Sequence, residues 1–274
     1  MDYYQYTFKT EAATAEILIA LLGQYPFDTF QETTEGLEAY IPCTAFDEEV
    51  GQYIEMIAKQ FNTQATKKLV EGQNWNAVWE SNFQPIIVED FCAVRADLHE
   101  AVKGVKYELI IQPKMSFGTG HHATTYLMMQ QMRDLDFAGR RVFDYGCGTG
   151  VLAILASKLD AQSVDAIDID QWAYENTVEN IATNQVSNVH AKQGTLDTFS
   201  LKTYDIILAN ITFNVIVNSL EELASTLPTG GWLLTSGYFV EDVDKLCLLA
   251  ATFGFTAQKQ LRKEDWMCIL FQNK

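Results

Sequence analysis

Residues 142–153 (VFDYGCGTGVLA) decide the fold of this chain. An apolar strand reaches an acid at Asp144, enters a turn with three glycines at alternate positions, and continues directly into an apolar helix. Glycine at positions 146, 148 and 150 lets the backbone approach a bound ligand that any Cβ atom would push away. The run therefore predicts the first strand–turn–helix unit of a nucleotide-binding α/β sheet.

A second apolar strand follows and ends at Asp168, eighteen residues after Gly150. An acid at this place holds ribose hydroxyls in βαβ nucleotide sites. The glycine spacing is G-x-G-x-G rather than the G-x-G-x-x-G of dinucleotide sites, so the helix dipole is less well aimed at a pyrophosphate. This spacing disfavours a nicotinamide dehydrogenase and resembles the S-adenosylmethionine (SAM) site of class I methyltransferases.

From Arg140 onward, predicted strands and helices alternate, which indicates a parallel sheet with helices on both faces. The last two strands follow one another directly, as in the antiparallel edge hairpin of class I methyltransferases. The predicted fold class is α/β, with a Rossmann-like seven-stranded sheet. We expect strands near 141–145, 163–168, 188–192, 204–209, 231–236, 255–261 and 266–272, and helices near 150–159, 171–184, 213–226 and 240–252.

The first 62 residues predict a small α+β domain in the order β-α-β-β-α, which fits a ferredoxin-like fold. A hairpin signal at Thr34-Glu35-Gly36 lies between its second and third strands. Residues 63–73, which are polar and basic, are interpreted as a linker with an exposed helix, and 74–274 as the methyltransferase domain. Trp75, Trp79 and Phe83 are interpreted as packing anchors rather than a ligand cage.

Composition and charge narrow the functional classes. Of the 274 residues, 48% are apolar, and the net charge of −17 argues against a nucleic acid substrate. No stretch is apolar enough for a membrane span, and no signal peptide is visible. Five cysteines, an odd number, favour reduced thiols in the cytoplasm. Residues 1–62 contain eleven acidic and two basic side chains. This acidic excess is interpreted either as a solvated surface or as a means of steering a basic partner.

Two reactive residue types invite alternative interpretations. Cys147 lies inside the glycine turn, where a small tolerated side chain is favoured over a nucleophile. His121 and His122 are adjacent, and neither has a Cys or His partner at the spacing of a metal site. The sequence therefore predicts neither a thiol enzyme nor a metalloenzyme.

Three further segments resemble one family. Residues 113–125 (PKMSFGTGHHATT), 205–211 (DIILANI) and 265–269 (DWMCI) are similar to segments of the bacterial ribosomal protein L11 methyltransferases, the PrmA family. The resemblance covers the chain from about residue 73 to its end, whereas the N-terminal domain agrees only in architecture. Ala123 departs from the family pattern, because many members have proline there.

The resemblance implies a set of site residues. Asn210 is implied beside the reactive methyl group, as the catalytic residue, and Asp168 on the ribose. An open alternative for Asn210 is a cap for the helix that begins near Thr212. The residues implied in cofactor binding are Phe117, Thr125, Gly146, Gly148, Asp168 and Asn210.

The implied activity is SAM-dependent methylation of amino groups, on lysine side chains or the N-terminal α-amine, of ribosomal protein L11. Asn210-Ile211-Thr212-Phe213 stands where many nitrogen methyltransferases carry Asn/Asp-Pro-Pro-Tyr/Phe, which favours a flexible aliphatic amine over a planar amide. The acidic N-terminal domain is the expected contact for the ribosomal protein, and a monomer is expected. The alternatives are a SAM-dependent methyltransferase of another protein or small amine, or a SAM-binding ribosome-assembly factor without catalysis.

Overall fold

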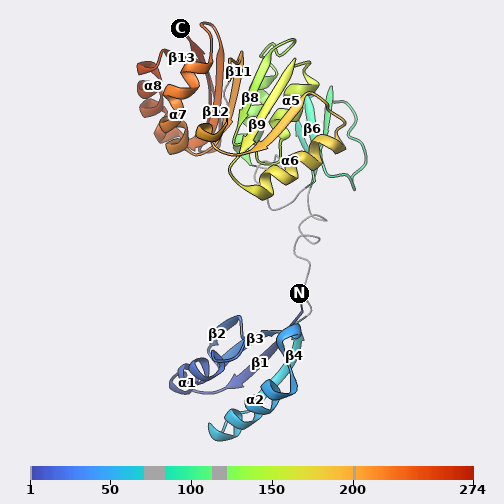
Figure 1. The fold of residues 1–274 in the computed structure, drawn as a ribbon, viewed down its shortest axis with the longest axis vertical. Coiled ribbons are helices and arrows are strands. Elements are labelled where there is room, and N and C mark those ends of the chain that lie inside the picture. The colour runs from blue at the N-terminus through green and yellow to red at the C-terminus, as the bar shows by residue number, and fades with distance from the viewer. Residues whose placement is uncertain (1, 71–83, 113–121, 200–201) are drawn as a thin grey trace. The chain divides into compact units, whose positions relative to one another are not determined.

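The computed structural model describes residues 2–70, 84–112, 122–199 and 202–274 (Figure 1). The chain separates into two compact units, residues 1–78 and 79–274. Within the described residues, none of the helices is both long and apolar enough to cross a membrane. Each unit has its own hydrophobic core and is described by itself.

The N-terminal unit is a four-stranded antiparallel sheet with two helices, in the strand order β2-β3-β1-β4. This is the ferredoxin-like order expected from the sequence. Tyr6 and Phe8 of the first strand and Leu18 of the first helix are buried in its core. The elements are β1 (Tyr3–Lys9), α1 (Ala12–Leu22), β2 (Thr29–Thr33), β3 (Gly36–Pro42), α2 (Glu48–Gln60) and β4 (Ala65–Val70).

Strand β4 corrects the prediction of a linker helix over residues 63–73. It pairs with β1 from Phe8↔Ala65 to Tyr3↔Val70 and completes the fold. Its polar composition fits an edge position, where lysines are common because one side of the strand faces solvent. Lys67 lies with its Nζ atom 3.5 Å from the ring centres of both Tyr4 and Phe46, so its side chain also covers the aromatic core.

The C-terminal unit contains a seven-stranded sheet in the order β10-β9-β8-β11-β12-β14-β13, parallel except for β14. All seven predicted strands and the four helices between them are present within a few residues of the expected bounds. The strands are β8 (Arg141–Tyr145), β9 (Ser163–Asp168), β10 (Val189–Gln193), β11 (Ile206–Asn210), β12 (Trp232–Phe239), β13 (Phe255–Lys263) and β14 (Trp266–Asn273). The helices are α4 (Ala123–Met132), α5 (Val151–Lys158), α6 (Gln171–Thr183), α7 (Phe213–Thr226) and α8 (Val243–Thr252).

Alternate residues of the central strands enter two separate cores. Val142 packs into a cluster with residues of α4 and α5, whereas Phe143 packs into a second cluster with residues of α7 and α8. Figure 1 shows α5 and α6 on one side of the sheet and α7 and α8 on the other. This double burial explains why the strands are almost continuously apolar.

A three-stranded sheet precedes α4 in the C-terminal unit. It consists of β5 (Ile86–Val88), β6 (Cys92–Arg95) and β7 (Tyr107–Ile110). Asn184 at the end of α6 fastens β7, because its Oδ1 accepts from the Ile110 N–H at 3.0 Å and its Nδ2 donates to the Ile110 carbonyl at 2.6 Å. The proposed packing anchors Trp75, Trp79 and Phe83 lie outside the described residues.

Candidate active site

The glycine turn lies where the strand order reverses, because β8 has β9 on one side and β11 on the other. Ligands of open α/β sheets bind at this switch point, beyond the carboxyl ends of the strands. Gly146 has φ +73°, and a Cβ atom there would lie 2.2 Å from Cγ2 of Ile211. Both the left-handed conformation and the close approach therefore require glycine at this position.

Two side chains of helix α6 donate hydrogen bonds to the glycine turn. The Thr177 hydroxyl donates to the Gly148 carbonyl at 2.7 Å, and Asn180 Nδ2 donates to the Thr149 carbonyl at 2.9 Å. Cys147 is buried with its Sγ 3.5 Å from the Thr177 hydroxyl, and burial raises the pKa of its thiol well above the usual value. A protonated, buried thiol is a poor nucleophile, which supports the structural interpretation of this cysteine.

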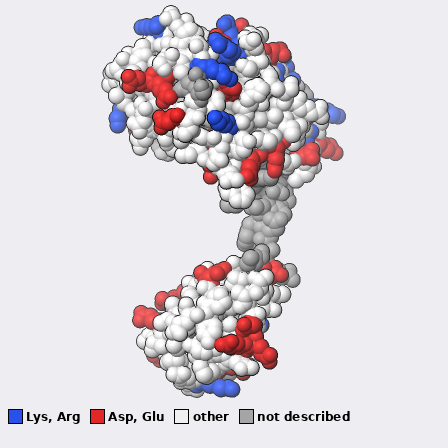
Figure 2. Space-filling model, viewed as in Figure 1, with Lys and Arg blue, Asp and Glu red and all other residues white. Residues whose placement is uncertain are grey.

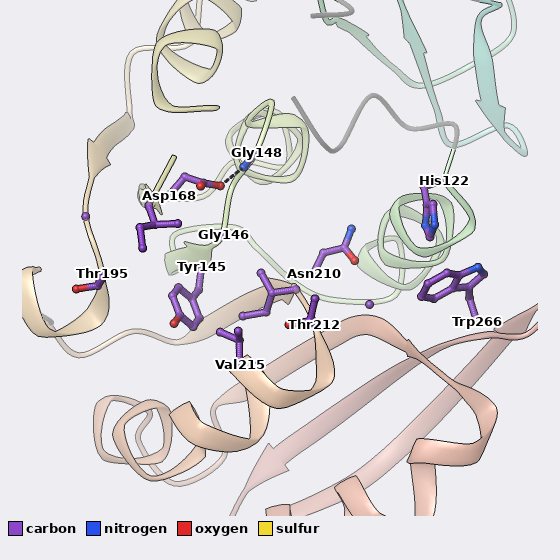
Figure 3. Close-up of a pocket in the computed structure, with 14 residues that line it drawn as sticks. His122, Tyr145, Gly146, Gly148, Asp168, Thr195, Asn210, Thr212, Val215 and Trp266 are labelled. Carbon is purple, nitrogen blue, oxygen red and sulfur yellow. Dashed lines mark hydrogen bonds between the residues drawn. The ribbon is translucent and has the colours of Figure 1, made fainter. Parts of the chain in front are cut away.

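Asp168 ends β9 and faces the turn. Its Oδ2 accepts the Gly148 N–H at 2.9 Å, and its Oδ1 accepts the Asp170 N–H at 3.0 Å (Figure 3). A carboxylate has about four acceptor positions, so capacity for two further donors remains. The backbone bonds fix the carboxylate in place before any ligand arrives.

Asn210 ends β11 and is 8% exposed. Its Nδ2 donates to the hydroxyl oxygen of the fully buried Thr125 at 3.3 Å, which orients the amide. Its Oδ1 is buried without a hydrogen-bond partner among the described residues. A buried acceptor without a partner is costly, so it indicates a ligand donor at this position. Thr212, not Asn210, occupies the N-cap position of helix α7, although its side chain makes no capping hydrogen bond, so the capping interpretation of Asn210 is wrong.

A cavity of about 470 Å³ joins these residues. Four of the predicted site residues line it: Gly146, Gly148, Asp168 and Asn210. Thr125 is absent from the lining and supports Asn210 from behind, and Phe117 lies outside the described residues. In Figure 3, Asp168 and Thr195 lie toward one end of the cavity, Asn210 near the middle, and His122 and Trp266 at the other end.

His122 and Trp266 are lining residues that the sequence did not assign to the site. His122 caps the first turn of α4, where its Nδ1 accepts the Thr124 N–H at 3.3 Å. Trp266 begins β14, and the centres of the two rings lie 4.5 Å apart. Both residues belong to segments singled out in the sequence, but nothing local in either segment shows that they meet.

Asp144 is a second acid beneath the glycine turn. It is 1% exposed; its Oδ2 accepts the Ala153 N–H at 3.0 Å, and its Oδ1 has no partner among the described residues. Burial, with a contribution from the charge of Asp168, raises the pKa of Asp144 to about 7. The acid at the end of β8 is thus a buried group under the turn, whereas Asp168 faces the cavity.

Comparisons with known proteins identify the relatives of this chain. The sequence model of a family described as "Ribosomal protein L11 methyltransferase (PrmA)" matches residues 12–274. A ribosomal protein L11 methyltransferase of Porphyromonas gingivalis is 38% identical, over 99% of this chain and 98% of the relative. One of Chlorobaculum parvum is 35% identical, over 100% and 97%. The crystal structure of the ribosomal protein L11 methylase of Lactobacillus delbrueckii subsp. bulgaricus matches with TM-score 0.63 and 26% identity, over 70% of this chain and 100% of that one.

Proposed function

The chain belongs to the ribosomal protein L11 methyltransferase (PrmA) family, a family of SAM-dependent methyltransferases, and from this premise we propose that it methylates amino groups of ribosomal protein L11. The targets are lysine side chains, the N-terminal α-amine, or both. One observation carries the proposal: a single cavity joins the glycine turn and Asp168 to an Asn210 acceptor that has no partner within the described part of the chain.

The residues of the cavity fit SAM. Gly146 and Gly148 leave room for the methionine part, and Asp168 has acceptor positions for the two ribose hydroxyls. When bound, SAM would supply a methyl group on a positively charged sulfur. Transfer of that methyl group to an amine would leave S-adenosylhomocysteine. No lysine or arginine is among the described residues that line the cavity, so the site has no group of basic side chains for a phosphate. This agrees with SAM, which has no phosphate.

Positioning of the amine is the main task of the protein. A lysine must first lose its proton, which costs roughly 4 kcal/mol at pH 7.4 for a pKa near 10.4. The proton goes to water, and an amine N–H then donates to Asn210 Oδ1, which leaves the nitrogen lone pair free to attack. Thr125 holds the Asn210 amide in the required orientation.

The N-terminal unit, bounded by β4 rather than by residue 62, is the proposed contact for the substrate protein. Residues 1–70 contain eleven acids and four bases. Figure 2 shows several groups of acidic side chains on the visible face of this unit. Such a surface attracts a basic partner such as a ribosomal protein and repels free nucleic acid. We place the reaction in the cytoplasm, where ribosomal proteins are made, because all five cysteines are free, and we expect the enzyme to act as a monomer.

Mass spectrometry of purified L11 after incubation with the protein and SAM tests the proposal. We expect mass increments of about one methyl group each, and none with Asp168→Ala. Binding of SAM without any increment on L11 would contradict the substrate and favour another protein or a small amine. Binding of both SAM and L11 without methylation of any substrate would favour an assembly factor.

A further inference from the structure

The end of the cavity beyond Asn210 is built from aromatic rings. Trp266 pairs through its backbone with Phe239 at the end of β12, and the two ring centres lie 4.2 Å apart. His122 contacts the same indole from the start of α4, with an angle of 70° between the ring planes. Because Phe239 is 41% exposed, this row of rings extends from the cavity to the surface.

Negative charge is concentrated at the opposite end. Asp168 carries the only carboxylate among the described residues that line the cavity, and Asn210 lies between it and Trp266 (Figure 3). Glu264, whose charge acts on His122, is exposed and does not line the cavity. A cation that reaches the aromatic end thus meets the Trp266 indole, and no carboxylate among the described lining residues. Tryptophan is the side chain whose ring attracts cations most strongly.

His122 adds no competing positive charge. Its Nδ1 lies 2.8 Å from the Thr124 hydroxyl oxygen and 3.3 Å from the Thr124 backbone nitrogen. Burial lowers the pKa of His122, so the neutral form prevails at neutral pH. The ring centre of His122 lies 4.5 Å from that of Trp266, so we assign His122 the role of holding the indole.

Repeated methylation changes what a nitrogen can bind. In each transfer the nitrogen lone pair forms an N–C bond, the sulfur–methyl bond breaks with its electrons returning to sulfur, and the amine proton goes to water. Each added methyl group replaces one N–H donor, until a trimethylated nitrogen has none for Asn210. A ring face, in contrast, binds the methylated cation better as its apolar surface grows.

Resting on the proposed function, we propose that Trp266 determines specificity for methylated aliphatic amines. Its indole face, held by His122 and Phe239, binds the mono- and dimethylammonium products and so permits further transfers to the same nitrogen. Without the indole, singly methylated products would be released before a second transfer.

Calorimetry on the full-length protein saturated with S-adenosylhomocysteine tests the site directly. The probes are N-acetyl-lysine methylamide and its Nζ-trimethyl form. We expect the wild type to prefer the trimethyl probe by roughly 5- to 30-fold, Trp266→Leu to lose this preference, and Trp266→Phe to keep part of it. Trp172→Leu is the matched control, because Trp172 is 76% exposed and outside the cavity lining.

Two results would overturn the proposal. One is a wild type that binds both probes equally; the other is a preference that survives in Trp266→Leu. If the leucine variant does not fold, as judged by its affinity for S-adenosylhomocysteine, an undiminished preference in Trp266→Phe would have the same meaning. A second readout is the product pattern on L11, which should shift from multiple methylation to monomethylation in Trp266→Leu.

Failure of the proposed function gives a different result. If the wild type leaves L11 unmodified but shows a trimethyl preference that depends on Trp266, the substrate is wrong and the aromatic site stands. If L11 is methylated repeatedly by both wild type and Trp266→Leu, the function stands and the aromatic site is wrong.

Discussion

The two ends of the cavity differ in whether backbone or side chains form the wall. At the Asp168 end, three glycines, at positions 146, 148 and 194, put backbone into the wall, and the turn is tied to β9, where the N–H groups of Gly146 and Cys147 both donate to the Ile167 carbonyl. At the Trp266 end, side chains from β14, α4 and β11 meet, although they are far apart in the sequence. A wall made of backbone admits little change without loss of the cofactor. A wall made of side chains can be altered by single substitutions, so it is the end where acceptor specificity can vary.

The largest effect is expected from Asp168→Ala, which alters the backbone-built end of the cavity. We expect affinity for S-adenosylhomocysteine to fall by about 3–4 kcal/mol, because two charge-assisted bonds to the ribose are lost. Asp170→Ala is the control in the same turn; it removes the cap on the Ala173 N–H and should cost about 1 kcal/mol of stability without changing affinity. Calorimetry and thermal unfolding separate the two effects. Equal losses of affinity in both variants would contradict the ribose assignment.

Asp144→Asn tests how much the buried carboxyl group next to the glycine turn costs in stability at neutral pH. The pKa of Asp144 is raised to about 7 from its ordinary value of 3.8, so the unfolded chain loses this proton first as the pH rises. The native state therefore loses stability progressively from about pH 4, and the loss is complete above about pH 7. Asparagine carries no charge and can still accept the Ala153 N–H. From pH 5 to pH 8, urea unfolding should show the wild type losing about 2–3 kcal/mol more than Asp144→Asn.

Asp244→Asn, on the exposed surface of α8, provides the control for that measurement and should follow the wild type. A pH profile of Asp144→Asn that matches the wild type would show that Asp144 is ionised in the native state at low cost.

The smallest effect is expected at Thr125, on the side-chain-built end. Thr125→Val removes the acceptor for Asn210 Nδ2, so the amide loses its fixed orientation at a cost of about 1 kcal/mol. We expect kcat to fall roughly 3- to 10-fold with unchanged affinity for S-adenosylhomocysteine. Thr125→Ser retains the hydroxyl and should restore kcat. An unchanged kcat in Thr125→Val would show that Asn210 does not need this contact.

The signals in the sequence for the backbone-built end are local. Gly146 follows an apolar strand directly and Asp168 ends the next one, and parallel strands present their carboxyl ends at the same edge of the sheet. The seven strands were likewise predictable, since burial on both faces makes them almost continuously apolar. Strand order and register were not predicted, because no local pattern encodes them.

The side-chain-built end was not predictable in the same way. His122 meets Trp266 only because α4 packs against β14 and because β14 pairs with β12. No spacing along the chain encodes a contact between residues this far apart. Thr125 was assigned to the cofactor from its motif, whereas its observed contact is to Asn210. Strand β4 was missed because an edge strand with lysines has the polar composition of a loop.

The closing strand β4 has a practical consequence for dissecting the protein. A fragment that ends at residue 62 would leave the backbone of β1 from Tyr3 to Phe8 without its neighbour. Unpaired backbone donors and acceptors along a strand with three tyrosines and a phenylalanine would attract other copies of the fragment, and the sample would precipitate. A fragment that ends after residue 70 keeps the outer edge guarded by Lys67 and Lys68, so a difference of eight residues separates a usable binding domain from an aggregating one.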